Sequence, residues 1–94
     1  MAVYLVTWDL NNEKPNYAAA RNRFIAHLSR YEHIKDRGLD SVWFIATSWT
    51  ADEVSADLRT QLDDNDRLFV TKLVLGNHRG WLATSVWDWI NARI

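Results

Sequence analysis

Short apolar runs alternate along the chain with longer stretches in which apolar positions recur at helical spacing. Residues 2–8 are apolar except for Thr7, which predicts a strand buried on both faces of a sheet. The polar stretch 9–12 ends this strand in a turn. Residues 41–47 and 67–75 form two further apolar runs rich in strand-forming residues, so each of them also predicts a strand.

Helical patterns lie between and after these strands. Over residues 15–30 apolar side chains recur three and four positions apart, and Pro15 suits the first turn of a helix. Thr50 and Glu53 have the spacing of a capping box, which predicts a second helix over residues 51–62. Ser85, with Asp88 three positions later, predicts the start of a short final helix.

The segment 31–36 decides between two folds. As a strand it forms a hairpin with residues 41–47, and the order β-α-β-β-α-β then predicts an antiparallel sheet with both helices on one face. This is a ferredoxin-like α+β sandwich with an added C-terminal helix. As the frayed end of the first helix, the same segment would leave a small parallel α/β unit. We expect the first fold, because the chain between the helix and the next apolar run is long enough for a hairpin.

Length and composition limit the remaining possibilities. The 94 residues predict a single domain over 1–94, and the absence of cysteine excludes disulfides and thiolate metal sites. The opening apolar run lacks a basic leader and is too short to cross a bilayer, so we expect a cytoplasmic protein with no membrane partner. Six Trp exceed what so small a core easily hides, which predicts a homodimer with contributions from Trp81, Trp87 and Trp89.

Charge is segregated along the chain although the formal net charge is only −1. Residues 50–66 hold six acidic side chains and a single arginine, so the rest of the chain is basic. A set of basic residues on and near the first helix and after the last strand could lie along the phosphates of RNA or DNA. These residues are Lys14, Arg21, Arg23, Arg30 and Arg79. A solvated helix face is the commoner explanation of such a pattern.

Asp9 is the first candidate for chemistry, because it ends the first strand at an edge of the sheet. One carboxylate holds a divalent cation only if waters, other ligands or a symmetry mate complete the shell, and a simple turn aspartate is the alternative. The acidic run 63–66 lacks the glycine and bidentate glutamate of a calcium loop, so we interpret it as a solvated turn. The three histidines lack zinc-ligand spacing, and no glycine loop cradles phosphate.

Several short stretches resemble one family. Residues 3–10, Val-Tyr-Leu-Val-Thr-Trp-Asp-Leu, resemble the first strand of the CRISPR-associated protein 2 superfamily, which includes VapD-like and SinR-like proteins. Residues 47–54, 62–70 and 87–90 resemble the SinR-like branch. The matches together span most of the chain, and each is short. Trp8 stands where the family has tyrosine, and there is no clear second catalytic motif.

The resemblance implies a ferredoxin-like homodimer. Where such proteins cleave nucleic acid, it implies a Mg²⁺-dependent reaction centred on the aspartate matching Asp9, with two Asp9 carboxylates holding the ion across the two-fold axis. Our first hypothesis is therefore a metal-dependent endoribonuclease or other nuclease in a defence or toxin–antitoxin setting. Our second hypothesis is a non-catalytic dimeric module that binds nucleic acid or acts as a protein adaptor.

Overall fold

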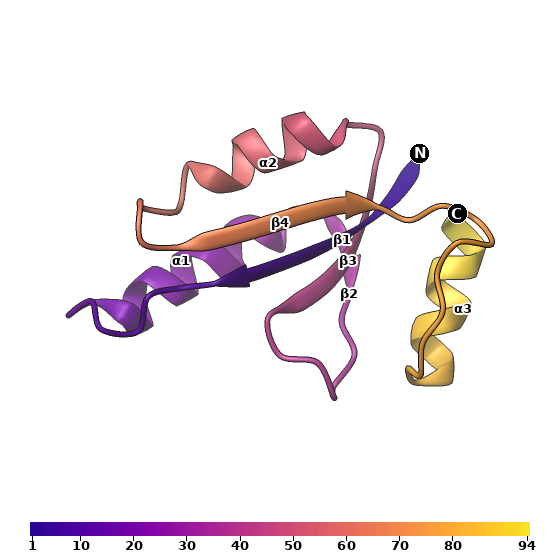
Figure 1. The fold of residues 1–94 in the computed structure, drawn as a ribbon, viewed down its shortest axis with the longest axis horizontal. Helices are drawn as coiled ribbons and strands as arrows, with labels where there is room; N and C mark the ends of the chain where they lie inside the picture. Colours follow the sequence, from indigo (N-terminus) through magenta and orange to yellow (C-terminus); the bar gives the residue numbers. More distant parts are fainter.

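A computed structural model describes all residues, 1–94, as an open sheet with helices on both faces (Figure 1). The elements follow along the chain in the order β1 (Ala2–Asp9), α1 (Tyr17–Leu28), β2 (Glu32–Ile34), β3 (Val42–Thr47), α2 (Ala51–Arg59), β4 (Arg67–Lys72) and α3 (Thr84–Arg93). No helix has the length and apolar character needed to cross a membrane.

The sheet confirms the expected α+β, ferredoxin-like fold with an added C-terminal helix. Its strands lie in the order β2-β3-β1-β4, and every neighbouring pair is antiparallel. The uncertain segment is a strand of three residues, β2, paired with β3. The parallel α/β alternative is therefore wrong, because β1 and β3 run in opposite directions.

The larger core lies on the sheet face covered by α1 and α2. Alternate residues of a strand point to opposite faces, and the even-numbered residues of β1 face these helices. The cluster joins both central strands to both helices; its buried members are Tyr4, Val6, Trp8, Leu10, Phe24, Leu28, Trp43, Ile45, Val54 and Leu58. Within it, the rings of Trp8 and Trp43 lie edge to face, with centroids 6.2 Å apart and an interplanar angle of 77°.

A smaller core lies on the opposite face, under α3. Val86 and Ile90 of α3 pack against Val3 and Phe44, so β1 is buried on both faces as predicted. Trp87 and Trp89 are half-buried around this cluster, whereas Trp81 is 98% exposed in the preceding loop. The predicted participation of these three residues in a homodimer stays a prediction.

Two polar contacts fix the ends of α3. The Asp36 carboxylate accepts a hydrogen bond of 2.7 Å from the backbone N–H of Ala83, which is the N-cap residue. This N–H and that of Gly38 lower the pKa of Asp36. At the other end Arg93 donates to Glu32 across 2.9 Å. The helix starts one residue earlier than predicted, and Ser85 lies inside its first turn, because the cap comes from a distant carboxylate.

The other element ends agree with the sequence prediction to within three residues. The first helix begins at Tyr17, since Pro15 lies in a turn before it, and α2 ends at Arg59. The predicted capping box of α2 is confirmed: Thr50 Oγ1 accepts from the Glu53 N–H at 3.1 Å, and Glu53 Oε1 accepts from the Thr50 N–H at 2.9 Å. The last strand stops at Lys72, where the chain turns away toward α3.

Candidate functional site

Asp9 lies on the sheet face opposite α1 and α2. It has the same parity as Val3 and Leu5 of β1, which pack in the smaller core, so its side chain leaves the sheet on the α3 side. α3 does not reach this end of the strand, and Asp9 is exposed. Its carboxylate accepts no hydrogen bond and forms no ion pair within the chain. The carboxylate is therefore free to bind something else.

A shallow depression of about 200 Å³ surrounds Asp9. Its lining residues come from β1 and β4, and Arg67 lies directly across the ladder from Asp9. The Arg67 guanidinium donates instead to the backbone carbonyls of Asp64 and Asp66, at 3.3 and 3.0 Å. Phe69 is 62% exposed beside the depression. One acidic, one basic and one aromatic side chain thus meet on an open part of the sheet.

The residues around Asp9 fit a divalent cation only in an open, water-rich form. No group of three or more His, Cys, Asp or Glu side chains is arranged to hold a metal ion. Mg²⁺ commonly uses one or two carboxylates and completes its shell with waters and substrate phosphates. Asp9 offers one such carboxylate. A closed cage made by a single chain is excluded by this geometry.

The acidic turn 63–66 was predicted to be solvated, and one of its residues is buried instead. Asp63 and Asp64 are exposed, but the Asp66 side chain is 1% exposed, so the turn is not simply solvated. The Asp66 carboxylate accepts from the backbone N–H groups of Asn11 and Asp63 at 2.9 and 3.0 Å. Burial alone would raise the pKa of Asp66, but these bonds and the Lys14 ammonium outweigh it and lower the pKa. Asp66 is a structural residue that joins two loops.

Lys14, predicted to contact nucleic acid, is occupied by this turn. Its ammonium lies 2.8 Å from Asp66 Oδ1 and 2.9 Å from Asp63 Oδ2. Hydrogen bonds from Lys14 to both carboxylates raise its pKa. Its charge is thus already neutralised within the chain.

Arg30 is also held by a carboxylate, in a cluster between α1 and α2. Asp57 Oδ2 accepts from Arg30 Nη2 and from the Tyr31 hydroxyl, both at 2.6 Å, and Asp57 Oδ1 lies 2.9 Å from His27 Nε2. Burial raises the pKa of Tyr31, and the neighbouring Asp57 raises it further. Burial alone would raise the pKa of Asp57 as well, but the hydrogen bonds from Tyr31, His27 and Arg30 outweigh it and lower the pKa. The cluster joins the two helices.

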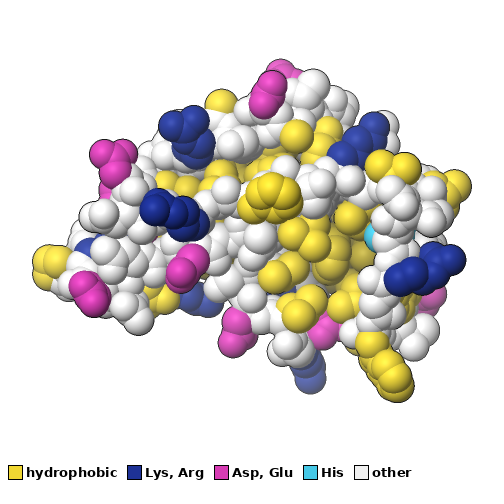
Figure 2. Space-filling view, viewed as in Figure 1, with side chains coloured by type: hydrophobic (Ala, Val, Ile, Leu, Met, Phe, Trp, Pro, Cys, Tyr) yellow, Lys and Arg dark blue, Asp and Glu magenta, His cyan; other side chains and the backbone are white.

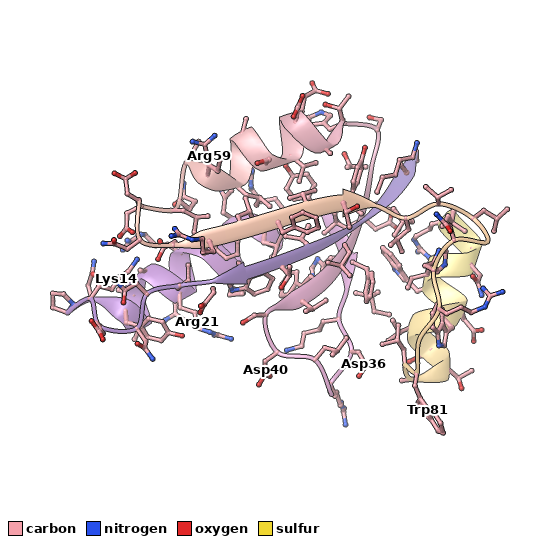
Figure 3. All side chains as sticks on the ribbon, in the orientation of Figure 1. Lys14, Arg21, Asp36, Asp40, Arg59 and Trp81 are labelled. Atoms are coloured by element: carbon pink, nitrogen blue, oxygen red, sulfur yellow. The ribbon has the colours of Figure 1, made fainter.

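The remaining three predicted contacts do not share one surface with Asp9. Arg21 and Arg23 are exposed on α1, across the sheet from the Asp9 side chain. Figure 3 shows Arg21 at the end of the molecule opposite Trp81, and Arg79 precedes Trp81 by two residues in the same loop. On the face shown in Figure 2, Lys and Arg side chains are scattered singly. The fold therefore provides no continuous basic track through all five residues, and their contact with nucleic acid stays a prediction.

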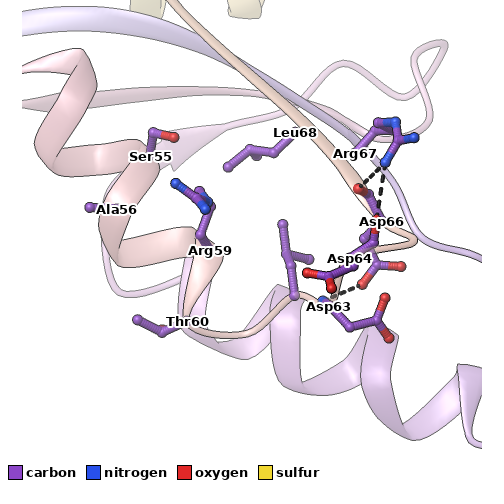
Figure 4. Close-up of a pocket in the computed structure, with 10 residues that line it drawn as sticks. Ser55, Ala56, Arg59, Thr60, Asp63, Asp64, Asp66, Arg67 and Leu68 are labelled. Atoms are coloured by element: carbon purple, nitrogen blue, oxygen red, sulfur yellow. Dashed lines mark hydrogen bonds between the residues drawn. The ribbon is translucent and has the colours of Figure 1, made fainter.

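A groove between α2 and β4 was not predicted from the sequence (Figure 4). Its volume is about 550 Å³. Two arginines, Arg59 and Arg67, line it together with the carboxylates of the acidic turn. In the sequence, Arg59 precedes and Arg67 follows the acidic residues 63–66, and this pattern was the only indication of the groove.

Comparison with known proteins adds no relative. No protein-family model matches the sequence, and no curated protein is similar to it at a significant level. Membership of the CRISPR-associated protein 2 superfamily therefore stays a prediction from the short matches described above.

Proposed function

We propose that this protein is a metal-dependent nuclease of the CRISPR-associated protein 2 type, acting on RNA or DNA, with Asp9 as the residue that anchors Mg²⁺. One observation carries the proposal: the Asp9 carboxylate is exposed, free of internal partners and placed in an open depression at the end of β1. A defence or toxin–antitoxin role in the cytoplasm belongs to this proposal.

The chemistry assigned to Asp9 is to fix one side of a cation that meets a phosphodiester. When bound, the ion would lower the pKa of a water and offset charge on the phosphate. The rest of its shell would come from waters and phosphate oxygens, or from Asp9 of a second copy. Arg67, across the ladder, places a positive charge beside the position that a second phosphate would take. Thr7 donates its hydroxyl to the Ser41 carbonyl at 2.8 Å and so supports the strand.

A non-catalytic binding or adaptor module is the second candidate. It is favoured by the lack of any three-residue metal cluster within the chain. In that case the exposed Phe69 and the free Asp9 serve recognition alone.

The decisive experiment compares the parent with Asp9→Asn on single- and double-stranded RNA and DNA, with Mg²⁺ or Mn²⁺ and then with EDTA. Asn keeps the shape but loses the charge, so we expect cleavage to fall at least about 100-fold while the far-ultraviolet circular dichroism is unchanged. Asp64→Asn is the matched control, because Asp64 is exposed and its carboxylate has no partner within the chain.

Equal cleavage by the parent and Asp9→Asn would assign the activity to another site or to a contaminant. If the parent cleaves none of the substrates, the binding module is the better description. Calorimetric titration of both proteins with Mn²⁺ measures their affinity for the metal independently of cleavage.

A further inference from the structure

Phe69 is an aromatic residue that the fold leaves without a packing partner. Its side chain is 62% exposed, and it belongs to neither of the two hydrophobic cores. It also takes part in none of the pairs of neighbouring aromatic rings in the molecule. Single exposed apolar side chains are common on protein surfaces, so exposure alone says little. The position of the ring beside Asp9 is what suggests a role for it.

Phe69 lies on the same sheet face as Asp9, and both line the depression of about 200 Å³. Across the β1–β4 ladder Phe69 pairs with Thr7 and Arg67 pairs with Asp9, so all four side chains leave the same face. α3 covers this face only at its other end, near the chain termini (Figure 1). Diagonal neighbours on one face lie about 7–8 Å apart, so one small ligand can contact both the ring and the carboxylate.

Most neighbours of the ring on this face are polar. Thr7 lies directly across from Phe69, and Arg67 and Thr71 lie on either side of it along β4. Arg67 donates to the two backbone carbonyls through Nη1 alone, so the N–H groups of Nε and Nη2 remain for a ligand. A flat ring between a free carboxylate and free guanidinium donors fits a nucleotide, which combines a flat base with an anionic phosphate.

We propose that Phe69 stacks on an unpaired base of the nucleic acid and so positions the adjoining phosphate at the cation held by Asp9. This inference rests on the proposed function and deepens it, because it names the part of the substrate that the chain contacts. Arg67 binds a second phosphate through its free N–H groups. Stacking uses only the flat face of a base, which every base has, so the contact does not depend on the base sequence.

A protein surface is a less suitable occupant of this depression. It would have to cover the Asp9 carboxylate and the free N–H groups of Arg67 in order to bury a single ring. Covering charged groups without giving them partners costs free energy. A nucleotide leaves neither group unpaired, since its phosphates accept from Arg67 and share the cation with Asp9.

The experiment compares two DNA strands by fluorescence anisotropy in EDTA at low ionic strength, where phosphate contacts are strongest. One strand has about 12 thymidylates, and the other has the same sugars and phosphates without bases. EDTA removes the cation that the proposed nuclease needs, so affinity is measured without cleavage. The parent should bind the strand with bases at least about fivefold more tightly, because stacking on one aromatic ring contributes that much.

Substitutions of Phe69 should act on this difference alone. Phe69→Ala should bind both strands as weakly as the parent binds the strand without bases. Phe69→Trp keeps a flat ring and should keep the preference, whereas Phe69→Leu stays apolar without a ring and should lose it. Trp81→Ala is the matched control and should change neither affinity, since it removes a 98% exposed ring from the loop before α3. All four variants alter exposed side chains, so far-ultraviolet circular dichroism should show the parent fold.

Equal affinity of the parent for the two strands overturns the proposal, and so does a parent that binds neither. An equal loss of affinity of Phe69→Ala for both strands also overturns it, because stacking has no effect where bases are absent. The outcome is separate from that of the nuclease test. Base-dependent binding through Phe69 without any cleavage would keep this inference and refute the nuclease. Cleavage through Asp9 that Phe69→Ala leaves unchanged, with no base-dependent binding, would do the reverse.

Discussion

At the scale of single residues, Asp66 shows how one buried carboxylate organises two loops. It receives backbone N–H groups from the segment after β1 and from its own turn, and it pairs with Lys14. A buried charge of this kind is tolerated only because each oxygen is hydrogen-bonded. The loop that follows Asp9 is thereby fixed to the start of β4.

We expect Asp66→Asn to destabilise the fold by about 2 kcal/mol, because it removes the charge that strengthens the hydrogen bonds from Lys14 and from the backbone N–H groups of Asn11 and Asp63. Urea unfolding at neutral pH measures this difference. Asp64→Asn, in the exposed part of the same turn, should change the free energy of unfolding by less than about 0.5 kcal/mol. Equal effects of the two substitutions would contradict the structural role of Asp66.

The pH dependence of stability gives an independent check on the same residue. The pKa of Asp66 is lower in the folded protein than in the unfolded chain. Its contribution to stability is therefore fully present above the unfolded pKa and is lost as the pH falls through the folded pKa. The parent should therefore lose part of its stability below about pH 4, and Asp66→Asn should show a weaker dependence there.

Some residues could be placed from the sequence, and others could not because their environment depends on distant parts of the chain. Asp9 could be placed at the end of a strand from the apolar run alone. The burial of Asp66 could not, because it depends on Asn11 and Lys14, which are distant in the sequence. The left-handed backbone of Ser41, with φ of 55°, likewise follows from tertiary bonds, since its carbonyl accepts from Thr7 and Trp8 of β1.

At the scale of elements, local signals predicted the helix that carries its own cap. The capping box of α2 is contained in four consecutive residues, so it was visible in the sequence. The start of α3 was predicted one residue late because its N-cap residue, Ala83, has no capping side chain, and the N–H of Ala83 donates to Asp36 of another loop. The strand β2 was the weakest prediction, since three residues carry little pattern and its pairing with β3 supplies most of its definition.

We expect Thr50→Ala to destabilise the protein by about 1 kcal/mol, because it removes the side-chain acceptor of the Glu53 N–H at the start of α2. Ser85→Ala is the matched control. Ser85 lies within the first turn of α3 and caps nothing, so this variant should have nearly the same free energy of unfolding as the parent. Thermal unfolding of the three proteins decides the matter. Similar losses from both substitutions would refute the assigned caps.

At the scale of the whole molecule, the sequence predicted the sheet but not the distribution of its charges. The order of apolar runs and helices was enough for the topology, because few connections are compatible with it. The five basic residues do not form one surface, because some of them pair with carboxylates that lie nearby in the fold but far away in the sequence. Lys14 pairs with the acidic turn, and Arg30 pairs with Asp57 of α2.

The edge-to-face pair of Trp8 and Trp43 has an optical consequence. Their indoles come from β1 and β3, and they are close enough for their electronic transitions to couple. We therefore expect an exciton couplet in the far-ultraviolet circular dichroism of the folded protein, superimposed on the signals of its strands and helices. Trp43→Phe should abolish the couplet, whereas Trp81→Phe should preserve it, because Trp81 projects into solvent. A couplet that survives Trp43→Phe would have another origin. If Trp43→Phe abolishes the couplet, its appearance during folding reports the pairing of β1 with β3.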